Sequence, residues 1–349
     1  MKQAGMRGIA AALAAALLFG ASTPLAKLLL AHASPWLLAA LLYLGSGIGL
    51  FLVRRARRMP AVSLARGELG WLAGAILAGG IVAPVLLMLG LARMPASGAS
   101  LLLNAEGVLT ALLAWFVFHE NFDRRVALGM LAIVAGAVVL TWPGEAHFAG
   151  SEAALLVLGA CLAWAIDNNL TRKVSLADAS FIAMTKGLAA GTTNLLLALT
   201  LDASWPAPSV VAGALALGFA SYGASLTLFV VALRQLGTAR TGAYFSVAPF
   251  FGTLLAIGLL GEPVTLQLVL AGALMILGVW LHLTERHEHA HAHEGVAHEH
   301  AHEHGGDPHH DHAHEPPVAT GTRHSHWHTH APLTHSHPHF PDMHHGHRH

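Results

Sequence analysis

The hydrophobic pattern of the chain is a series of long apolar runs separated by short polar clusters. The runs are rich in Leu and Ala and do not alternate, which favours membrane helices over the strands of a barrel. A helix of about 20 apolar residues crosses a bilayer core. Cutting the sequence at its polar clusters therefore predicts ten membrane helices, over 8–31, 35–53, 71–92, 97–118, 126–142, 152–171, 179–201, 209–233, 240–260 and 264–283.

The same landmarks occur twice along these runs. A Leu-Leu-Ala triplet, a Glu, a Leu and a Gly each recur 142 residues later, as 112–114 and 254–256, Glu120 and Glu262, Leu128 and Leu270, and Gly136 and Gly278. Paired membrane halves are how many transporters are built. We therefore predict an all-α membrane protein with one five-helix repeat over 1–142, a second over 150–284, and a separate tail over 285–349.

Composition supports a membrane protein. Hydrophobic residues make up 54% of the chain and charged residues 11%. A water-soluble protein of this length must show much polar surface, so the solvent for most of this chain must be lipid. Cys161 is the single cysteine, which excludes an intrachain disulfide and a Cys-based metal site.

The Lys and Arg residues set an orientation. With a cytoplasmic N-terminus, the inner segments collect almost all of them and the outer loops only Arg93. We therefore expect the inner (plasma) membrane as the location, both termini in the cytoplasm, and residues 1–31 kept as the first helix. Because five spans is an odd number, the second repeat enters from the opposite side, so the repeats are expected to be inverted.

At this point the chain resembles the EamA type of the drug/metabolite transporter superfamily. The resemblance covers 8–283, and its motifs are Phe19-Gly20-Ala21-Ser22-Thr23-Pro24 with Lys27, Trp164-Ala165-Ile166-Asp167-Asn168-Asn169 with Arg172, Ala248-Pro249, Gly261-Glu262, Gly272 and Gly278. It implies ten helices in two repeats around a central cavity. It also implies transport of small solutes, often amino acids, amphipathic metabolites or drugs, by proton coupling or exchange. The chain departs from the pattern where Glu106-Gly107 stands opposite Ala248-Pro249.

Ionisable residues inside membrane helices are costly and are therefore candidates for function. Four lie within the expected spans: Lys27, Glu106, Asp167 and Lys186. Glu106, near the middle of 97–118, is the strongest candidate, because its carboxyl group can carry a proton or bind a substrate amine. The alternative is a structural pair of Glu106 with Lys27 or Lys186.

The run Asp167-Asn168-Asn169 is the second candidate, together with Pro24 in the first span. Three successive polar side chains point about 100° apart around a helix, so at least one faces protein or water. These residues also compete for backbone hydrogen bonds, so we expect an irregular helix here. The alternative is that the helix simply leaves the bilayer before Arg172. Tyr244 is a weaker candidate for lining the cavity.

The tail from His287 onward has a different composition. It holds 23 of the 27 histidines, and its His-x-His runs are His287, His289, His291 and His293; His298, His300, His302 and His304; and His324, His326, His328 and His330. We expect a disordered cytoplasmic segment, because apolar residues are scarce. Imidazole suits Zn, Ni, Co and Cu, so these residues are metal-ligand candidates. The alternative is low-complexity drift with incidental metal binding.

These features favour a secondary carrier of a small solute with a metal-binding tail. The alternatives are a transition-metal transporter and a membrane-anchored metal sensor that transports nothing. An enzyme is not expected, because no nucleophile–base spacing or cofactor motif occurs, and no cofactor is required. The expected partners are the lipid bilayer, a small solute and divalent metal ions, with a homodimer left open and no nucleic acid.

Overall fold

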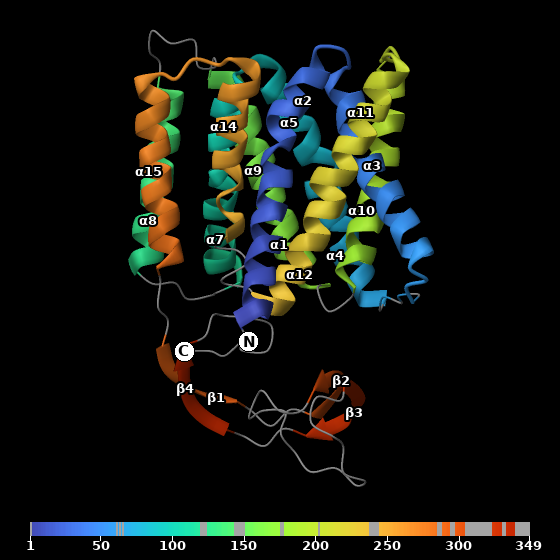
Figure 1. Cartoon of the computed structure of the whole chain (residues 1–349), viewed down its shortest axis with the longest axis vertical. Coiled ribbons are helices and arrows are strands. Elements are labelled where there is room, and N and C mark those ends of the chain that lie inside the picture. Colours follow the sequence, from blue (N-terminus) through green and yellow to red (C-terminus); the bar gives the residue numbers. More distant parts are fainter. Residues whose placement is uncertain are drawn as a thin grey trace. The chain divides into compact units, whose positions relative to one another are not determined.

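The computed structural model divides the chain into two units, Met1–Glu285 and Arg286–His349. In the first unit it describes residues 2–60, 62, 64, 66–118, 124–142, 151–174, 178–201, 203–236 and 244–284. In the second it describes 288–293, 297–303, 323–329 and 333–338. The first unit is helical over these residues (Figure 1).

The helices of the first half follow the expected apolar runs. They are α1 (Lys2–Gly20), α2 (Ser22–Leu30), α3 (Pro35–Ala56), α4 (Arg66–Ala75), the π-helical segment η1 (Ile76–Val82), α5 (Ala83–Arg93), α6 (Ala96–Leu102), α7 (Asn104–Phe118) and α8 (Arg124–Thr141). The start of α3 shows why one boundary falls where it does. Ser34 accepts a hydrogen bond from the Leu37 amide at 3.3 Å, and Pro35 occupies the first helical position.

The second half repeats this order. Its helices are α9 (Ser151–Arg172), α10 (Ala179–Thr200), α11 (Pro208–Gly218), the π-helical segment η2 (Phe219–Ala224), α12 (Ser225–Leu236), α14 (Ala248–Leu260) and α15 (Leu266–Leu283). Gly261 ends α14 with a φ of 65°, a left-handed conformation that glycine adopts without steric cost.

Seven helical stretches of the described residues are long and apolar enough to cross a membrane: Met6–Leu30, Pro35–Ala56, Gly67–Arg93, Ala96–Leu113, Glu152–Thr171, Ala179–Thr200 and Pro208–Phe229. Three shorter apolar helices, Ala127–Thr141, Ala248–Leu260 and Leu266–Leu281, coincide with the remaining predicted spans. The described helices therefore establish a multi-pass membrane protein.

The two π-helical segments lie at matching positions of the two halves. A shift of 142 residues carries 77–82 of η1 onto 219–224 of η2. A π-helical turn widens the backbone and is frequent at functional sites. We predicted matched irregularities at Pro24 and at Asp167–Asn169, and that prediction is wrong for the second place, because α9 continues through it to Arg172.

Glycines allow two close helix pairs, α3 with α10 and α8 with α15, which lie at opposite sides of the bundle in Figure 1. A Cβ built on Gly47 of α3 would lie 2.5 Å from the Leu188 amide nitrogen, and one on Gly187 of α10 would lie 2.6 Å from the Gly47 nitrogen. Gly136 of α8 and Gly278 of α15 each press against the backbone of the other helix. Close backbone approach of this kind stabilises helix pairs in lipid.

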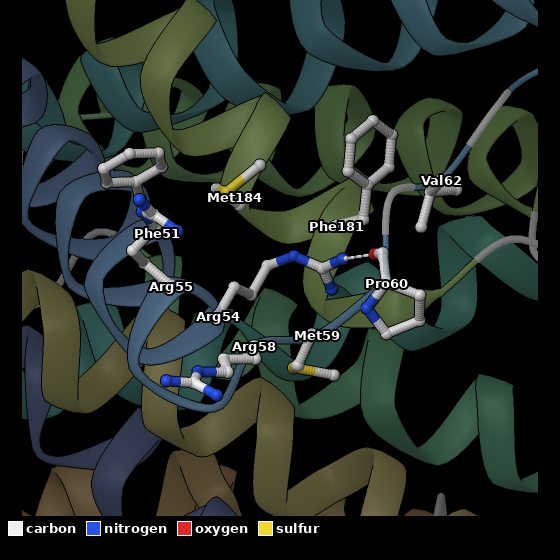
Figure 2. Close-up of a pocket in the computed structure, with 9 residues that line it drawn as sticks. All are labelled: Phe51, Arg54, Arg55, Arg58, Met59, Pro60, Val62, Phe181 and Met184. Carbon is white, nitrogen blue, oxygen red and sulfur yellow. Dashed lines mark hydrogen bonds between the residues drawn. The ribbon is translucent and has the colours of Figure 1, made fainter.

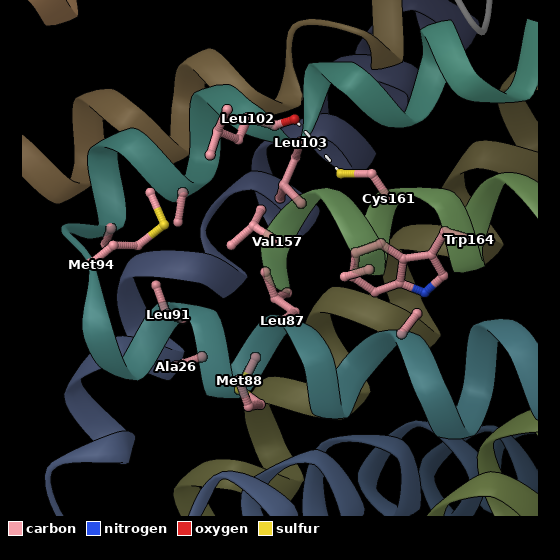
Figure 3. Close-up of a cluster of buried hydrophobic side chains, with 14 of the residues drawn as sticks. Ala26, Leu87, Met88, Leu91, Met94, Leu102, Leu103, Val157, Cys161 and Trp164 are labelled. Carbon is pink, nitrogen blue, oxygen red and sulfur yellow. Dashed lines mark hydrogen bonds between the residues drawn. The ribbon is translucent and has the colours of Figure 1, made fainter. Parts of the chain in front are cut away.

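An apolar cluster between α5 and α9 fills the middle of the bundle. Figure 3 shows Leu87 and Leu91 of α5 beside Val157 and Trp164 of α9, all buried. The Cys161 thiol is buried in the same cluster and donates to the Leu102 carbonyl at 3.6 Å. Packing of this density fixes α9, the helix that carries most of the polar residues described below.

The tail differs from our expectation of a disordered segment. Its described residues form four strands, β1 (Glu288–His293), β2 (Ala297–Glu303), β3 (Arg323–Thr329) and β4 (Leu333–Pro338). β1 pairs antiparallel with β4, and β2 with β3, as two separate two-stranded sheets. The correction has a physical reason, because His-x-His alternation has the period of two that a strand requires.

Candidate functional site

An ion pair between α9 and α10 forms the first part of a polar centre. The Lys186 ammonium donates to both carboxylate oxygens of Asp167 at 2.6 Å each. The side chains of Asp167 and Lys186 are 8% and 17% exposed. Thr171, one turn further along α9, donates its hydroxyl to Asp167 Oδ1 at 2.8 Å. Since a buried charge needs a partner, the Lys186 ammonium is committed to Asp167.

Glu106 of α7 forms the second part, facing α9. Its Oε1 accepts a hydrogen bond from Asn168 Nδ2 at 2.9 Å, and the same amide lies 3.3 Å from Thr110 Oγ1. Among the residues that the structure describes, no Lys or Arg lies within ion-pairing distance of the Glu106 carboxylate. A Cβ built on the next residue, Gly107, would meet nothing within 4 Å. The carboxylate therefore lies beside open space and is held by a neutral amide.

Asn169 ties the same two helices together through their backbones. Its side-chain amide donates to the Thr110 carbonyl at 3.3 Å and to the Ala165 carbonyl at 2.9 Å. The side chain of Asn169 is buried, whereas that of Asn168 is exposed. The three residues of the run thus have three roles: Asp167 faces α10, Asn168 faces Glu106, and Asn169 holds α7 against α9.

The η1 segment joins this centre through Gly79. Its carbonyl accepts from the Tyr43 hydroxyl at 2.6 Å and from Trp164 Nε1 at 3.0 Å. The Asp167 carboxylate packs directly against the Gly79 Cα, where a Cβ would lie 1.9 Å from Oδ2. Glycine is therefore required here for close approach, and its carbonyl is fixed by two side chains from other helices.

Aromatic rings extend the centre toward α1 and η2. The rings of Tyr43 and Tyr222 stack with centroids 5.5 Å apart, and Tyr222 meets Phe19 edge-on at 5.9 Å. Phe19 also contacts the Phe245 ring at 5.4 Å. Both tyrosine hydroxyls interact electrostatically with Glu106. The carboxylate, the amide and these rings together form a surface with one anionic and several aromatic groups.

Two predicted site residues lie elsewhere. The Lys27 ammonium donates to the Leu91 and Met94 carbonyls at 2.6 and 3.0 Å, at the end of α5. It thereby satisfies carbonyls that a helix end leaves free, and it does not pair with Glu106. Tyr244 packs against the small apolar cluster that contains Ala11 and Ala232. We therefore assign both residues to the scaffold.

Glu262 connects the two halves of the helical unit. Its carboxylate accepts from the Ala96 and Ser97 amides at 2.7 and 2.8 Å, at the start of α6. An acidic group at a helix N-terminus satisfies free amides and complements the helix dipole. The repeat-related Glu120 lies outside the described residues.

A pocket of about 470 Å³ lies away from the polar centre, at the end of α3 (Figure 2). Arg54 crosses it, donating to Asp178 Oδ1 at 2.6 Å and to the Pro60 carbonyl at 3.0 Å. Burial opposes ionisation of Asp178, but hydrogen bonds from Ser180 and the Phe181 amide and the charge of Arg54 outweigh it and lower the pKa of the carboxyl group. Arg54 thus fastens α3 to the start of α10.

Thr110, Thr171 and Trp164 are site residues that the sequence analysis missed. Each lies four residues from a residue we singled out, and so on the same helix face. That spacing was the available signal. Tyr43 and Gly79 lie in other helices, and their sequence context points to no partner. Among the residues whose side chains the structure describes, no group of three or more His, Cys, Asp or Glu side chains is arranged to hold a metal ion.

A helical bundle that spans the membrane several times and holds a carboxylate in its polar centre has the architecture of a transporter. The profile of the EamA-like transporter family matches the chain twice, over residues 6–142 and 151–284. The chain therefore belongs to the EamA-like transporter family, and it is a multi-pass membrane transporter of small solutes.

The relatives agree with this assignment. An uncharacterized transporter of Methanothermobacter thermautotrophicus is 29% identical over 292 residues, 78% of this chain and 85% of that protein. A probable amino-acid metabolite efflux pump of Salmonella typhimurium is 35% identical over 85 residues, 23% of this chain and 27% of that protein. A solved crystal structure superposes with a TM-score of 0.60 at 22% identity and covers 80% of this chain and 95% of that one, so it supports the fold.

Proposed function

We propose that the chain is a secondary transporter in which Glu106 binds a proton or the cationic group of the solute in turn. The observation that carries the proposal is the state of this carboxylate. It is within a membrane helix, it is bound by the neutral amide of Asn168, and it borders open space at Gly107. An intramembrane carboxylate without a fixed cation has to exchange its partner with something mobile.

The Asp167–Lys186 pair has a different part in this proposal. Its charges are mutually satisfied, and Thr171 takes part in the same network. It sets the position of α9 relative to α10, and so it places Asn168 beside Glu106. The pair is a positioning element, and Glu106 is the group that changes partner.

The alternating movement requires two halves that can exchange roles. We propose ten membrane helices in two inverted repeats, with both termini in the cytoplasm of the cell and the plasma membrane as location. The matching positions of η1 and η2 and the reciprocal contacts of Gly136 and Gly278 support a two-fold relation. The concentration of Lys and Arg on one set of loops supports the orientation.

We propose a solute with an ammonium group and an apolar body. Glu106 supplies the anionic contact, and the Tyr222, Tyr43 and Phe19 rings supply an aromatic wall to which cations and apolar groups both bind. The printed name of the Salmonella relative, a probable amino-acid metabolite efflux pump, is consistent with such a solute. Amino-acid esters and small aromatic amines are therefore the first compounds to test.

The test is uptake of these labelled compounds into proteoliposomes. Wild type and Glu152→Gln are expected to transport the same compound equally, because Glu152 lies 78% exposed in a surface pair with Arg93. Glu106→Gln is expected to lose uptake driven by a proton gradient. Equal uptake by Glu106→Gln and wild type would refute the role of Glu106. Equal uptake into protein-free liposomes would refute transport of that compound.

Transport of a transition metal is the competing function, since the tail is rich in His. Cells carrying the full chain or a form ending at Glu285 can be compared for uptake and efflux of Zn, Ni and Co. The proposed solute carrier predicts no change in metal flux in either case. A metal flux that depends on the chain would favour the metal transporter. Membership in a transporter family already argues against a sensor that transports nothing.

A further inference from the structure

The strand register of the tail places histidines opposite histidines. In the β2–β3 ribbon, His298 pairs with His328, His300 with His326 and His302 with His324. In the β1–β4 ribbon, His289 pairs with His337 and His291 with His335, and His293 stands opposite Leu333. A shift of one residue in either strand would abolish every such pair, so the register is specific.

The same register divides each ribbon into two unlike faces. Residues directly opposite each other in an antiparallel pair share a face, and residues two apart along a strand share it too. In the β2–β3 ribbon, one face therefore holds the six paired histidines. The other face holds the remaining positions: Ala297, Glu299, Ala301, Glu303, Arg323, Ser325, Trp327 and Thr329.

The spacing on the His face suits a metal ion. Opposed residues have Cβ atoms about 5 Å apart, and residues two apart along a strand are separated by about 6.6 Å. A metal–imidazole bond measures about 2.0–2.1 Å. Two neighbouring His–His rungs therefore bring four imidazoles within reach of one ion. A single strand or a disordered His-rich chain holds no such set in place.

We propose that each His-faced ribbon is a binding site for one divalent transition-metal ion of the kind that prefers imidazole, namely Zn, Ni, Co or Cu. The ligand set excludes hard cations such as Mg, which take oxygen ligands. It also contains no thiolate, because the single cysteine, Cys161, is buried in α9. The proposal is independent of the solute that the helical unit carries.

The test is a competition titration of the full-length protein in detergent with Ni and Zn against a chromophoric chelator, with Mg as the negative control. The ribbon variant combines His324→Ala, His326→Ala and His328→Ala. The matched control combines His309→Ala, His310→Ala and His312→Ala, the same number of histidines from the same tail. Both variants lose three imidazoles, so composition alone predicts the same effect on affinity for each.

The register predicts a difference. The ribbon variant should lose one tight ion per chain, or bind it more than about tenfold more weakly, because losing second-shell groups alone costs about 10–100-fold. The control should bind as wild type does. X-ray absorption of the Zn-loaded wild type should show four nitrogen ligands. Equal weakening in both variants, or a mainly oxygen ligand sphere, would overturn the proposal.

Discussion

Gly79→Ala tests how closely the polar centre is packed. The added Cβ would lie 1.9 Å from Asp167 Oδ2, 2.3 Å from its Cγ and 2.5 Å from its Cβ. Ordinary contact begins at 3.4 Å. The carboxylate must therefore move by about 1.5 Å, the difference between the two distances. The Gly79 backbone cannot easily give way instead, because Tyr43 and Trp164 hold its carbonyl.

The cost follows from what that movement breaks. Both Lys186–Asp167 hydrogen bonds are 2.6 Å long, and a shift of this size takes them beyond hydrogen-bonding distance. Separating a buried ion pair by removing one partner costs about 3–5 kcal/mol. Overpacking a core costs about 1–3 kcal/mol. Because the pair can partly re-form in a shifted position, we expect a loss of stability of about 3 kcal/mol.

The assay is thermal unfolding of the purified protein in detergent, with Gly70→Ala as the matched control. A Cβ at Gly70 of α4 would meet nothing within 4 Å, and Ala is the better helix former there. Gly70→Ala should be as stable as wild type or slightly more stable, and Gly79→Ala should unfold at a clearly lower temperature. Equal stability of the two variants would refute the close packing of Asp167 against η1.

Two further predictions concern the scaffold around the site. Lys186→Met should destabilise the protein by about 3 kcal/mol because it leaves Asp167 buried without a cation, and Asp167→Asn combined with Lys186→Met should recover part of that loss; thermal unfolding of both variants measures this, and a double variant no more stable than Lys186→Met would contradict the pairing. Glu262→Ala should cost about 1 kcal/mol by releasing the Ala96 and Ser97 amides at the start of α6, whereas Glu152→Ala should cost less; an equal effect in the same measurement would count against the cap.

The polar centre was largely predictable from the sequence. Glu106, Asp167, Asn168 and Lys186 stand out because polar residues in apolar runs are costly, and the structure brings these four together. Their partners were harder to predict. Whether Lys186 binds Asp167 or Glu106 depends on the rotation of α10 against α9, which no local pattern determines.

Lys27 shows the limit of reasoning from depth alone. It is a cation within a membrane helix, but the end of α5 offers carbonyl groups within its reach. Helix ends leave such carbonyls free, so a buried Lys has more than one way to be satisfied. The choice depends on where α2 and α5 cross, which is a property of the assembled fold.

The π-helical segments and the strand pairing of the tail could not be read from local sequence. A π-helical turn depends on contacts such as those of the Gly79 carbonyl with α3 and α9, which join residues far apart in the chain. The tail has strand alternation in plain view, but pairing β1 with β4 requires the register across some 40 intervening residues. Low apolar content alone therefore gave the wrong prediction for the described strands.

Proton movement driven by the solute tests the central claim most directly. Proteoliposomes loaded with a pH-sensitive dye receive the compound that wild type transports best from a panel of amino-acid esters and small aromatic amines. Wild type and Glu152→Gln should show a pH change inside the vesicles when the compound is added, and Glu106→Gln should show none, although it is incorporated equally. An unchanged pH signal from Glu106→Gln would contradict the assignment of this carboxylate as the group that exchanges proton and solute.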